Sequence, residues 1–382
     1  MKVYLDYNST TPVDKRVLEA MLPYFTEKFG NAASKTHSQG WIAEAAVEKS
    51  REQVANFIGA TPHEIIFTSG ATEAINLSIK GAFENYSGKG NHIVTVSTEH
   101  KAVLDTCRYL ETKGAHVTYL LVNREGLIDL DQLQESITEK TILVCVMTAN
   151  NETGVVQPMD EISRIVHEKG CLLMTDATQA VGKVQVNVEN DGIDLLCLSS
   201  HKLYGPKGTG ALYVRRKDPR VNVSPLIHGG GHERGLRSGT LNVPGIVGLG
   251  KACEIAEQEM WDDAQRISQL RTLLEQSFLD LRTVFVNGSI KNRLPNVTNL
   301  AFQGIKADEL IAKLPDIAVS TGSACTSAIP EPSHVLKSMG VSDEMAYSSI
   351  RFSLGKFTTK EEIEEVVFKI ASAIKELRPV QS

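Results

Sequence analysis

Short apolar runs alternate with longer amphipathic stretches along the chain from about residue 40 to residue 215. Several of these runs are continuously apolar, which is typical of strands that are covered on both faces of a sheet. The alternation of strands with helices predicts an α/β layer structure with a mainly parallel sheet. The predicted strands are 64–68, 92–97, 116–121, 141–148, 171–176, 194–199 and 210–214, and the predicted helices are 43–58, 72–82, 102–113, 129–136 and 159–169.

The pattern changes after about Val243. One long helical pattern is followed by two short strand patterns and a last helix, whose apolar residues fall on one stripe. These elements are predicted at 252–281, 284–287, 297–302 and 359–377, and the stripe consists of Ile363, Val366, Val367, Ile370, Ile374 and Leu377.

A chain of 382 residues has room for two or three domains at ~100–200 residues each. The change of pattern divides the chain into an α/β part and an α+β part, and the strand-like N-terminus is assigned to the second. We therefore predict a large domain over residues 14–250 and a smaller domain formed by residues 1–13 and 251–382.

Composition and charge exclude several classes of protein. The chain is 42% hydrophobic and 23% charged, which argues against a disordered or low-complexity chain. Forty basic residues against 46 acidic ones give a net charge of −6, so a chain-wide basic footprint for nucleic acid is missing. No apolar run approaches the ~20 residues that span a bilayer, and the N-terminus lacks a signal core. We expect a cytoplasmic protein with no membrane contact and no direct nucleic-acid partner.

The six cysteines, at 107, 145, 171, 197, 253 and 325, contain no CxxC pair. This spacing argues against a metal knuckle, and no metal site is expected. Cys145 and Cys197 lie in apolar strands and are expected to be buried. Cys325 instead lies among Ser, Thr, Gly and Ala, a setting typical of an exposed, nucleophilic thiol.

Residues 68–73, Thr-Ser-Gly-Ala-Thr-Glu, follow a predicted strand and open a helix. Small residues let the backbone approach an anion, and a helix N-terminus supplies unpaired N–H groups. A capped turn without a ligand explains this segment equally well. The segment matches neither GxGxxG nor GxxxxGK[ST], which counts against a nucleotide and against a nicotinamide dehydrogenase, the generic α/β alternative.

Asp176 and Lys202 each follow an apolar strand. Taken singly, Asp176 could cap the next turn, and Lys202 could extend its amine to water. Taken together with the anion site at 68–73, they supply the three groups that pyridoxal phosphate needs: a carboxylate for the ring nitrogen, a lysine for the aldehyde and a site for the phosphate. All three are predicted at one edge of the sheet, where open α/β sheets bind ligands.

Three further segments carry candidate chemistry. His100 follows a strand and could be a surface residue or could stack on a cofactor ring. Residues 228–240 hold five glycines, two histidines and two arginines, more anion-binding side chains than a flexible loop requires. Arg351 lies in a strand-like frame, where it could bind a carboxylate or form a structural ion pair.

These segments together resemble the pyridoxal-phosphate-dependent cysteine desulfurases of the NifS/IscS type. The similarity runs nearly end to end, with the matching segments in one order. They are residues 5–12, 67–73, 98–103, 149–154, 176–179, 201–208, 228–235, 237–240, 320–325 and 348–355.

The resemblance implies a fold-type I architecture, with a mainly parallel seven-stranded sheet in the large domain, and a homodimer that binds pyridoxal 5′-phosphate. It implies that Lys202 is the Schiff-base lysine, that Asp176 pairs with the ring nitrogen and that Cys325 accepts the sulfur. The phosphate would be held by Ala71, Thr72, Ser199 and His201, and by Thr240 of the other subunit.

The same resemblance assigns the remaining contacts of the site. Gln179 would contact the ring oxygen of the cofactor, and His100 would stack on the ring and carry protons. Asn151 would lie at the cofactor and, with Arg351, hold the carboxylate of the substrate.

The implied reaction converts L-cysteine to L-alanine through a persulfide on Cys325 and passes the sulfur to an acceptor protein, such as an iron–sulfur scaffold or a tRNA-thiolation relay. One alternative is a selenocysteine lyase or another β-eliminating enzyme on the same cofactor. Another is a non-catalytic sulfur-trafficking adaptor on this fold, against which intact Lys202, Asp176, His100 and Cys325 argue.

Overall fold

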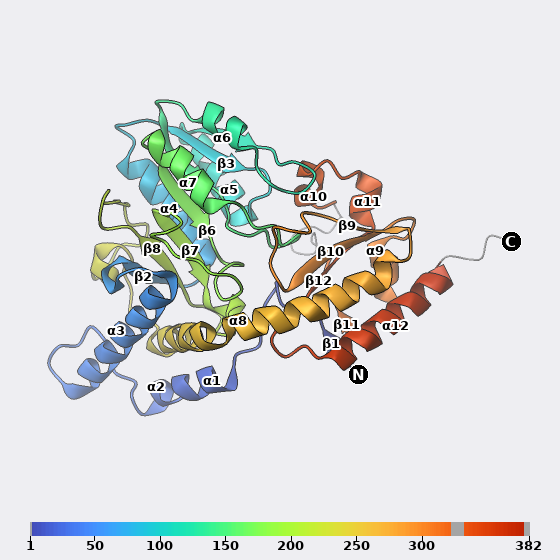
Figure 1. Cartoon of the computed structure of the whole chain (residues 1–382). Helices are drawn as coiled ribbons and strands as arrows, with labels where there is room; N and C mark the ends of the chain where they lie inside the picture. The colour runs from blue at the N-terminus through green and yellow to red at the C-terminus, as the bar shows by residue number, and fades with distance from the viewer. Residues whose placement is uncertain (1, 322–331, 378–382) are drawn as a thin grey trace.

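The computed structural model describes residues 2–321 and 332–377, and in these residues the chain forms two parts joined by one long helix (Figure 1). The larger part is built on a seven-stranded sheet with the order β2-β8-β7-β6-β5-β3-β4. Six of the strands run in one direction, and β8 pairs antiparallel with both β2 and β7. The strands are β2 (Ile65–Thr68), β3 (His92–Val96), β4 (His116–Leu120), β5 (Thr141–Cys145), β6 (Leu172–Asp176), β7 (Leu195–Ser199) and β8 (Gly210–Val214).

Helices cover both faces of this sheet, which confirms the predicted α/β layers. The side chains of β7 show why its sequence is continuously apolar: Leu195 and Cys197 pack on one face, while Leu196 and Leu198 pack on the other. One face carries α4 (Ala71–Asn85) and α5 (Lys101–Glu111), and the other carries α3 (Ser38–Ile58), α6 (Leu130–Ser136), α7 (Met159–Glu168) and the start of α8 (Val243–Leu279).

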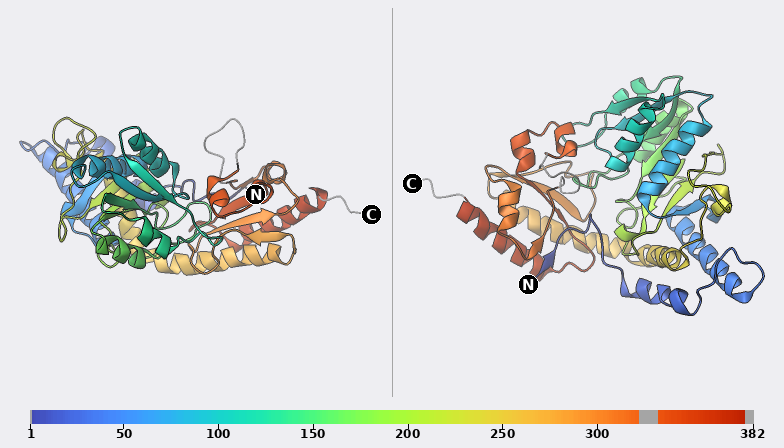
Figure 2. Two further views of the ribbon diagram at one scale, coloured as in Figure 1. Left: turned by 90° about the horizontal axis from the view of Figure 1, so that it is seen from above. Right: turned by 180° about the vertical axis from the view of Figure 1, so that it is seen from behind.

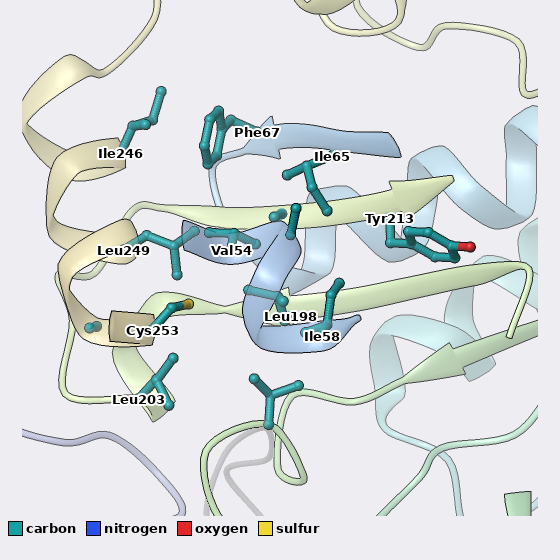
Figure 3. Close-up of a cluster of buried hydrophobic side chains, with 14 of the residues drawn as sticks. Val54, Ile58, Ile65, Phe67, Leu198, Leu203, Tyr213, Ile246, Leu249 and Cys253 are labelled. Carbon is teal, nitrogen blue, oxygen red and sulfur yellow. The ribbon is translucent and has the colours of Figure 1, made fainter. Parts of the chain in front are cut away.

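The long helix α8 begins at Val243, nine residues before the predicted start. The sequence did not predict this first section as helix because residues 243–251 contain a proline and three glycines, and both residue types disfavour a helix interior. The proline lies in the first turn, where its missing N–H has no intrahelical partner to lose. The glycines allow close packing, since a Cβ at Gly250 would lie 2.7 Å from the Cα of Ser50 on α3. Figure 3 shows the resulting cluster, in which side chains of α3 and α8 gather over β2, β7 and β8.

The smaller part holds an antiparallel sheet and a pair of parallel strands. Its core is formed by the far end of α8, by the sheet and by the predicted stripe of the last helix, in which Ile363, Val366, Ile370 and Ile374 are buried. Its strands are β1 (Val3–Tyr4), β9 (Val284–Val286), β10 (Val297–Phe302), β11 (Ile317–Ala318) and β12 (Ser349–Ser353), and its helices are α9 (Ala307–Ala312), α10 (His334–Ser338), α11 (Asp343–Tyr347) and α12 (Lys360–Leu377).

The N-terminal segment links the two parts (Figure 2). Strand β1 pairs with β11 of the smaller part, and the chain then reaches α1 (Lys15–Met21) and α2 (Pro23–Thr26) beside the larger one. The predicted domain boundary between residues 250 and 251 falls inside α8, so the division into domains stays a prediction. Across the described ranges, every helix is too short or too polar to cross a membrane.

The packing of α8 can be tested with two leucines of the same helix. Leu249 is fully buried in the cluster of Figure 3, whereas Leu279 is 40% exposed. Replacing Leu249 with alanine leaves a cavity and should lower the free energy of unfolding by about 2–5 kcal/mol. The control replacement Leu279→Ala should cost less than ~1 kcal/mol. Guanidinium unfolding curves compare the two, and equal losses would contradict this placement of α8.

Candidate active site

The carboxyl ends of β2, β6 and β7 meet at a pocket of about 1130 Å³ in the part of the chain that the structure describes. This is the edge at which the sequence predicted a ligand. Most of the predicted site residues line the pocket: Ala71, Thr72, His100, Asn151, Asp176, Gln179, Ser199, His201, Lys202 and Arg351. Thr240 is exposed and lies outside this lining, and Cys325 lies outside the described residues.

Lys202 follows β7 in the short helix η2 (Ser200–Lys202). Its Nζ donates hydrogen bonds to the backbone carbonyls of Asn8 (2.5 Å) and Ser9 (2.6 Å). The amine is therefore held at the pocket by the N-terminal segment and does not extend to bulk water.

Asp176 ends β6 and is buried. Its Oδ1 accepts a hydrogen bond from the backbone N–H of Thr178 at 3.0 Å, so the carboxylate does cap the following turn. The same side chain lines the pocket. The capping role and the ligand-facing role are therefore compatible in this structure.

The start of α4 forms a cradle for an anion. Gly70 has φ +154° and no side chain caps the helix, so the first-turn N–H groups point outward without a side-chain acceptor. A Cβ at Gly210 would lie 2.7 Å from the Cα of Gly70, so β8 needs glycine there to pack under this turn. Ser199, at the end of β7, and His201, which follows in η2, line the same pocket.

His201 and His100, two of the three histidines that line the pocket, have different environments. Burial, together with the nearby lysines, of which Lys202 has the largest effect, lowers the pKa of His201 to about 4, so its ring is neutral at pH 7. The Nδ1 of His100 accepts a hydrogen bond from the N–H of Ala102 and caps α5. A neutral His100 ring therefore carries its proton on Nε2.

Arg351 reaches the pocket from β12 of the smaller part. Its guanidinium donates to the carbonyl of Asn151 (3.0 Å), to Asp6 Oδ1 (2.7 Å) and to Ser9 Oγ (2.8 Å). The structural ion pair that the sequence left open does form, with Asp6. The buried Nε has no hydrogen-bond partner among the described residues.

The loop 228–240 is anchored by ion pairs within the chain. Glu233 is buried and forms a bidentate pair with Arg51 at 2.8 Å, and it also accepts the N–H of Phe67 at 2.7 Å. Arg237 pairs with Glu73 at the start of α4. Arg237, one of the two arginines that made this loop a candidate, therefore fixes it to α4, and Glu233 fixes it to β2 and Arg51.

Asn8 is a site residue that sequence reasoning missed. It is 1% exposed, and its backbone carbonyl accepts hydrogen bonds from both Lys202 and Gln179. Its side chain donates to the carbonyl of Asn151, the same carbonyl that Arg351 contacts. Asn8 lies in the matched segment 5–12, but a backbone carbonyl leaves no signal in residue type.

A second missed feature joins α10 to the segments that carry His100 and Asn151. Ser333 donates to Glu152 Oε2 at 2.5 Å, and His334 Nε2 donates to the carbonyl of Glu99 at 3.1 Å. Glu152 is buried at the pocket wall, and this burial raises the pKa of its carboxyl to about 7, although the Ser333 hydrogen bond opposes the shift.

The buried polar atoms of the pocket wall test whether a polar cofactor fits. Ser97 Oγ, Thr178 Oγ1 and Arg351 Nε are buried and have no partner among the residues described. A buried polar group without a partner is costly, so such atoms indicate a polar occupant. With the amine, the carboxylate and the anion cradle, this donor set fits pyridoxal phosphate.

Comparison with known proteins agrees with this geometry. A family model described as aminotransferase class-V matches residues 3–366. The cysteine desulfurase IscS of Anaeromyxobacter sp. (strain Fw109-5) is 54% identical over 379 residues, which cover 98% of this chain and 93% of that relative. A solved structure described as a NifS-like protein is 41% identical, with a TM-score of 0.92 over 98% of this chain and 100% of its own. A structure of SspA in complex with cysteine is 39% identical, with a TM-score of 0.83 over 94% and 100%.

The pKa of Glu152 makes a prediction about stability and pH. A carboxyl whose pKa is raised by folding binds its proton more tightly in the folded state, so its contribution is present below about pH 4.5 and is lost as the pH rises to about 7. Wild type should therefore lose up to about 3 kcal/mol of unfolding free energy relative to Glu152→Gln between pH 5 and pH 8.

Denaturant unfolding of both proteins across this pH range measures the difference. Glu161→Gln, at an exposed position on α7, is the matched control and should follow wild type. Parallel pH profiles for wild type and Glu152→Gln would show that Glu152 is not a buried, titrating carboxyl.

Proposed function

This chain belongs to the aminotransferase class-V family, and we propose that it is a pyridoxal-phosphate-dependent cysteine desulfurase. It converts L-cysteine to L-alanine and transfers the sulfur to an acceptor protein. The observation that carries the proposal is the meeting of Lys202, Asp176 and the start of α4 at one pocket. The names of the relatives, and the cysteine in the SspA complex, support the substrate.

When bound, pyridoxal phosphate supplies an aldehyde for covalent attachment and a ring that accepts electrons from the substrate Cα. In this proposal Lys202 would hold the aldehyde through its amine, and the freed amine would take the proton from the substrate Cα. Asp176 would hold the proton on the ring nitrogen. Both groups already lie at the pocket, with Lys202 fixed by the carbonyls of Asn8 and Ser9.

The remaining residues of the site would bind and orient the cofactor. The phosphate would be held by the N–H groups of Ala71 and Thr72 and by Ser199 and His201, all of which line the pocket. Gln179 would contact the ring oxygen of the cofactor, and His100 would stack on the ring and carry protons; both side chains line the pocket.

Arg351 and Asn151 hold the carboxylate of the substrate. The unpartnered Nε of Arg351 is a donor for that carboxylate, and the other two guanidinium nitrogens keep the plane of the group fixed. A charged N–H donor held in this way can form a strong hydrogen bond to a carboxylate oxygen.

Cys325 receives the sulfur. Its thiolate attacks the substrate Sγ, the Cβ–S bond breaks, and the carbon fragment takes up the electron pair and a proton to become L-alanine. The enzyme thiol and L-cysteine thus yield L-alanine and an enzyme persulfide. The other five cysteines are buried, and burial raises the pKa of each thiol, so they are poor nucleophiles. The acceptor in this proposal is a thiol of a partner protein, such as an iron–sulfur scaffold.

Two replacements test these assignments. Borohydride reduction of the loaded protein should fix the cofactor on the peptide that contains Lys202, and Lys202→Ala should abolish alanine formation. Cys325→Ser should keep the bound cofactor but lose persulfide formation and sulfur transfer. Pyruvate in place of alanine would identify a β-eliminating enzyme, and an adduct on another lysine would contradict the proposed site.

We also propose that the active form is a homodimer in which Thr240 binds the phosphate of the other subunit. The exposure of Thr240 on an anchored loop supports this contact. Mixed dimers of Lys202→Ala and Thr240→Val subunits should regain activity, because one of their two sites then has both Lys202 and Thr240.

Each homodimer alone is the control: Lys202→Ala should be inactive, and Thr240→Val should need more cofactor for half-saturation. If Thr240 acted within its own subunit, neither site of the mixed dimer would be intact and mixing would restore nothing.

A further inference from the structure

Lys183 has a partly buried amine next to Gln179 for which the mechanism above has no use. It follows Gly182, whose φ of +80° turns the chain back toward Gln179. The Lys183 Nζ donates to the backbone carbonyl of Gln179 at 3.0 Å and to Gln179 Oε1 at 2.9 Å. Both hydrogen bonds of this amine therefore go to one residue of the proposed cofactor site.

Lys183 determines which way the Gln179 amide faces. An amine nitrogen in this place donates to oxygen, so Oε1 must face Lys183 and Nε2 must face the opposite way. Nε2 indeed donates to the carbonyl of Asn8 at 2.9 Å. The flipped amide would place its N–H groups against the Lys183 amine and its oxygen against the Asn8 carbonyl, which are two unfavourable contacts.

This orientation decides what Gln179 offers a ligand. One N–H of Nε2 is used on the Asn8 carbonyl, which Lys202 also contacts. The second N–H remains, and Gln179 lines the pocket whereas Lys183 does not. Gln179 is thus fixed as a hydrogen-bond donor toward the pocket and cannot present its oxygen there.

Lys183 has no acidic partner in the described residues, and the charged groups that act on it are Lys202 and Arg351. Burial and these two cations lower the pKa of the Lys183 amine to about 7. Protonated or neutral, the amine keeps at least two N–H groups for the two Gln179 oxygens. The hydrogen bond from Nε2 to the Asn8 carbonyl favours the same orientation in both states.

We propose that Lys183 is a positioning residue, which holds Gln179 as a donor to the anionic ring oxygen of the cofactor. This proposal rests on the proposed function, because that oxygen belongs to pyridoxal phosphate. A donor to the ring oxygen stabilises its negative charge and so weakens proton binding at the lysine–cofactor linkage. Without Lys183 the amide can turn, and the linkage should hold its proton to higher pH.

The test is the pH at which the absorbance of the loaded protein changes as the linkage loses its proton. Lys183→Met should raise this midpoint by about 1 pH unit, and Lys183→Arg, which also only donates, should restore it toward wild type. Lys169→Met, at an exposed position at the end of α7, is the matched control and should not change it. If Lys183→Met did not fold, Lys183→Gln would replace it, because a glutamine in that place can accept as well as donate and no longer fixes the amide.

A double-mutant cycle with Gln179→Leu separates positioning from a direct effect of charge. If Lys183 acts through Gln179, adding Lys183→Met to Gln179→Leu should move the midpoint no further. Additive shifts, or no shift in Lys183→Met, would overturn the proposal while leaving the proposed function intact. If wild type formed no reducible linkage at Lys202, the proposed function itself would fail.

Discussion

The backbone carbonyl of Asn8 is the acceptor on which the geometry of the pocket depends. It binds Lys202 and Gln179 together, while the Asn8 side chain holds the carbonyl that Arg351 contacts. Groups from the larger sheet, the smaller sheet and the N-terminal segment thus share one small set of hydrogen bonds. Because Asn8 is 1% exposed, its side of these hydrogen bonds is shielded from water, which strengthens them.

The topology of the large sheet brings the remaining groups of the pocket together. Since β2, β6 and β7 run in the same direction, the groups that follow each strand reach the same edge, although the turn after β2 lies more than a hundred residues before Asp176 and Lys202 in sequence. The antiparallel strand β8 fits between β2 and β7 and requires Gly210 under the anion cradle. The proximity of the anion cradle, Asp176 and Lys202 therefore follows from the strand order alone and needs no ligand.

How far the sequence predicted this structure varies with the physical origin of each feature. The strands of the large sheet were predicted to within a few residues, because strands covered on both faces must be continuously apolar. The start of α8 was missed, since its glycines serve close packing, such as that of Gly250 on Ser50, and not helix propensity. The polar residues at the strand ends were found from their residue types. Asn8 and Glu152 were not, because a backbone carbonyl and a buried carboxyl acquire their roles only through tertiary packing.

The continuity of α8 has a consequence for how this chain can vary. Residues near its start belong to the core of the larger part, and residues from Ile267 to Phe278 belong to that of the smaller part. One residue inserted between them would rotate the far end by ~100° and shift it by ~1.5 Å. Such a rotation would move the smaller part, and with it Arg351 on β12, away from the pocket. The number of residues in α8 is therefore more tightly constrained than the identity of its exposed residues. Insertions in related chains should occur outside α8.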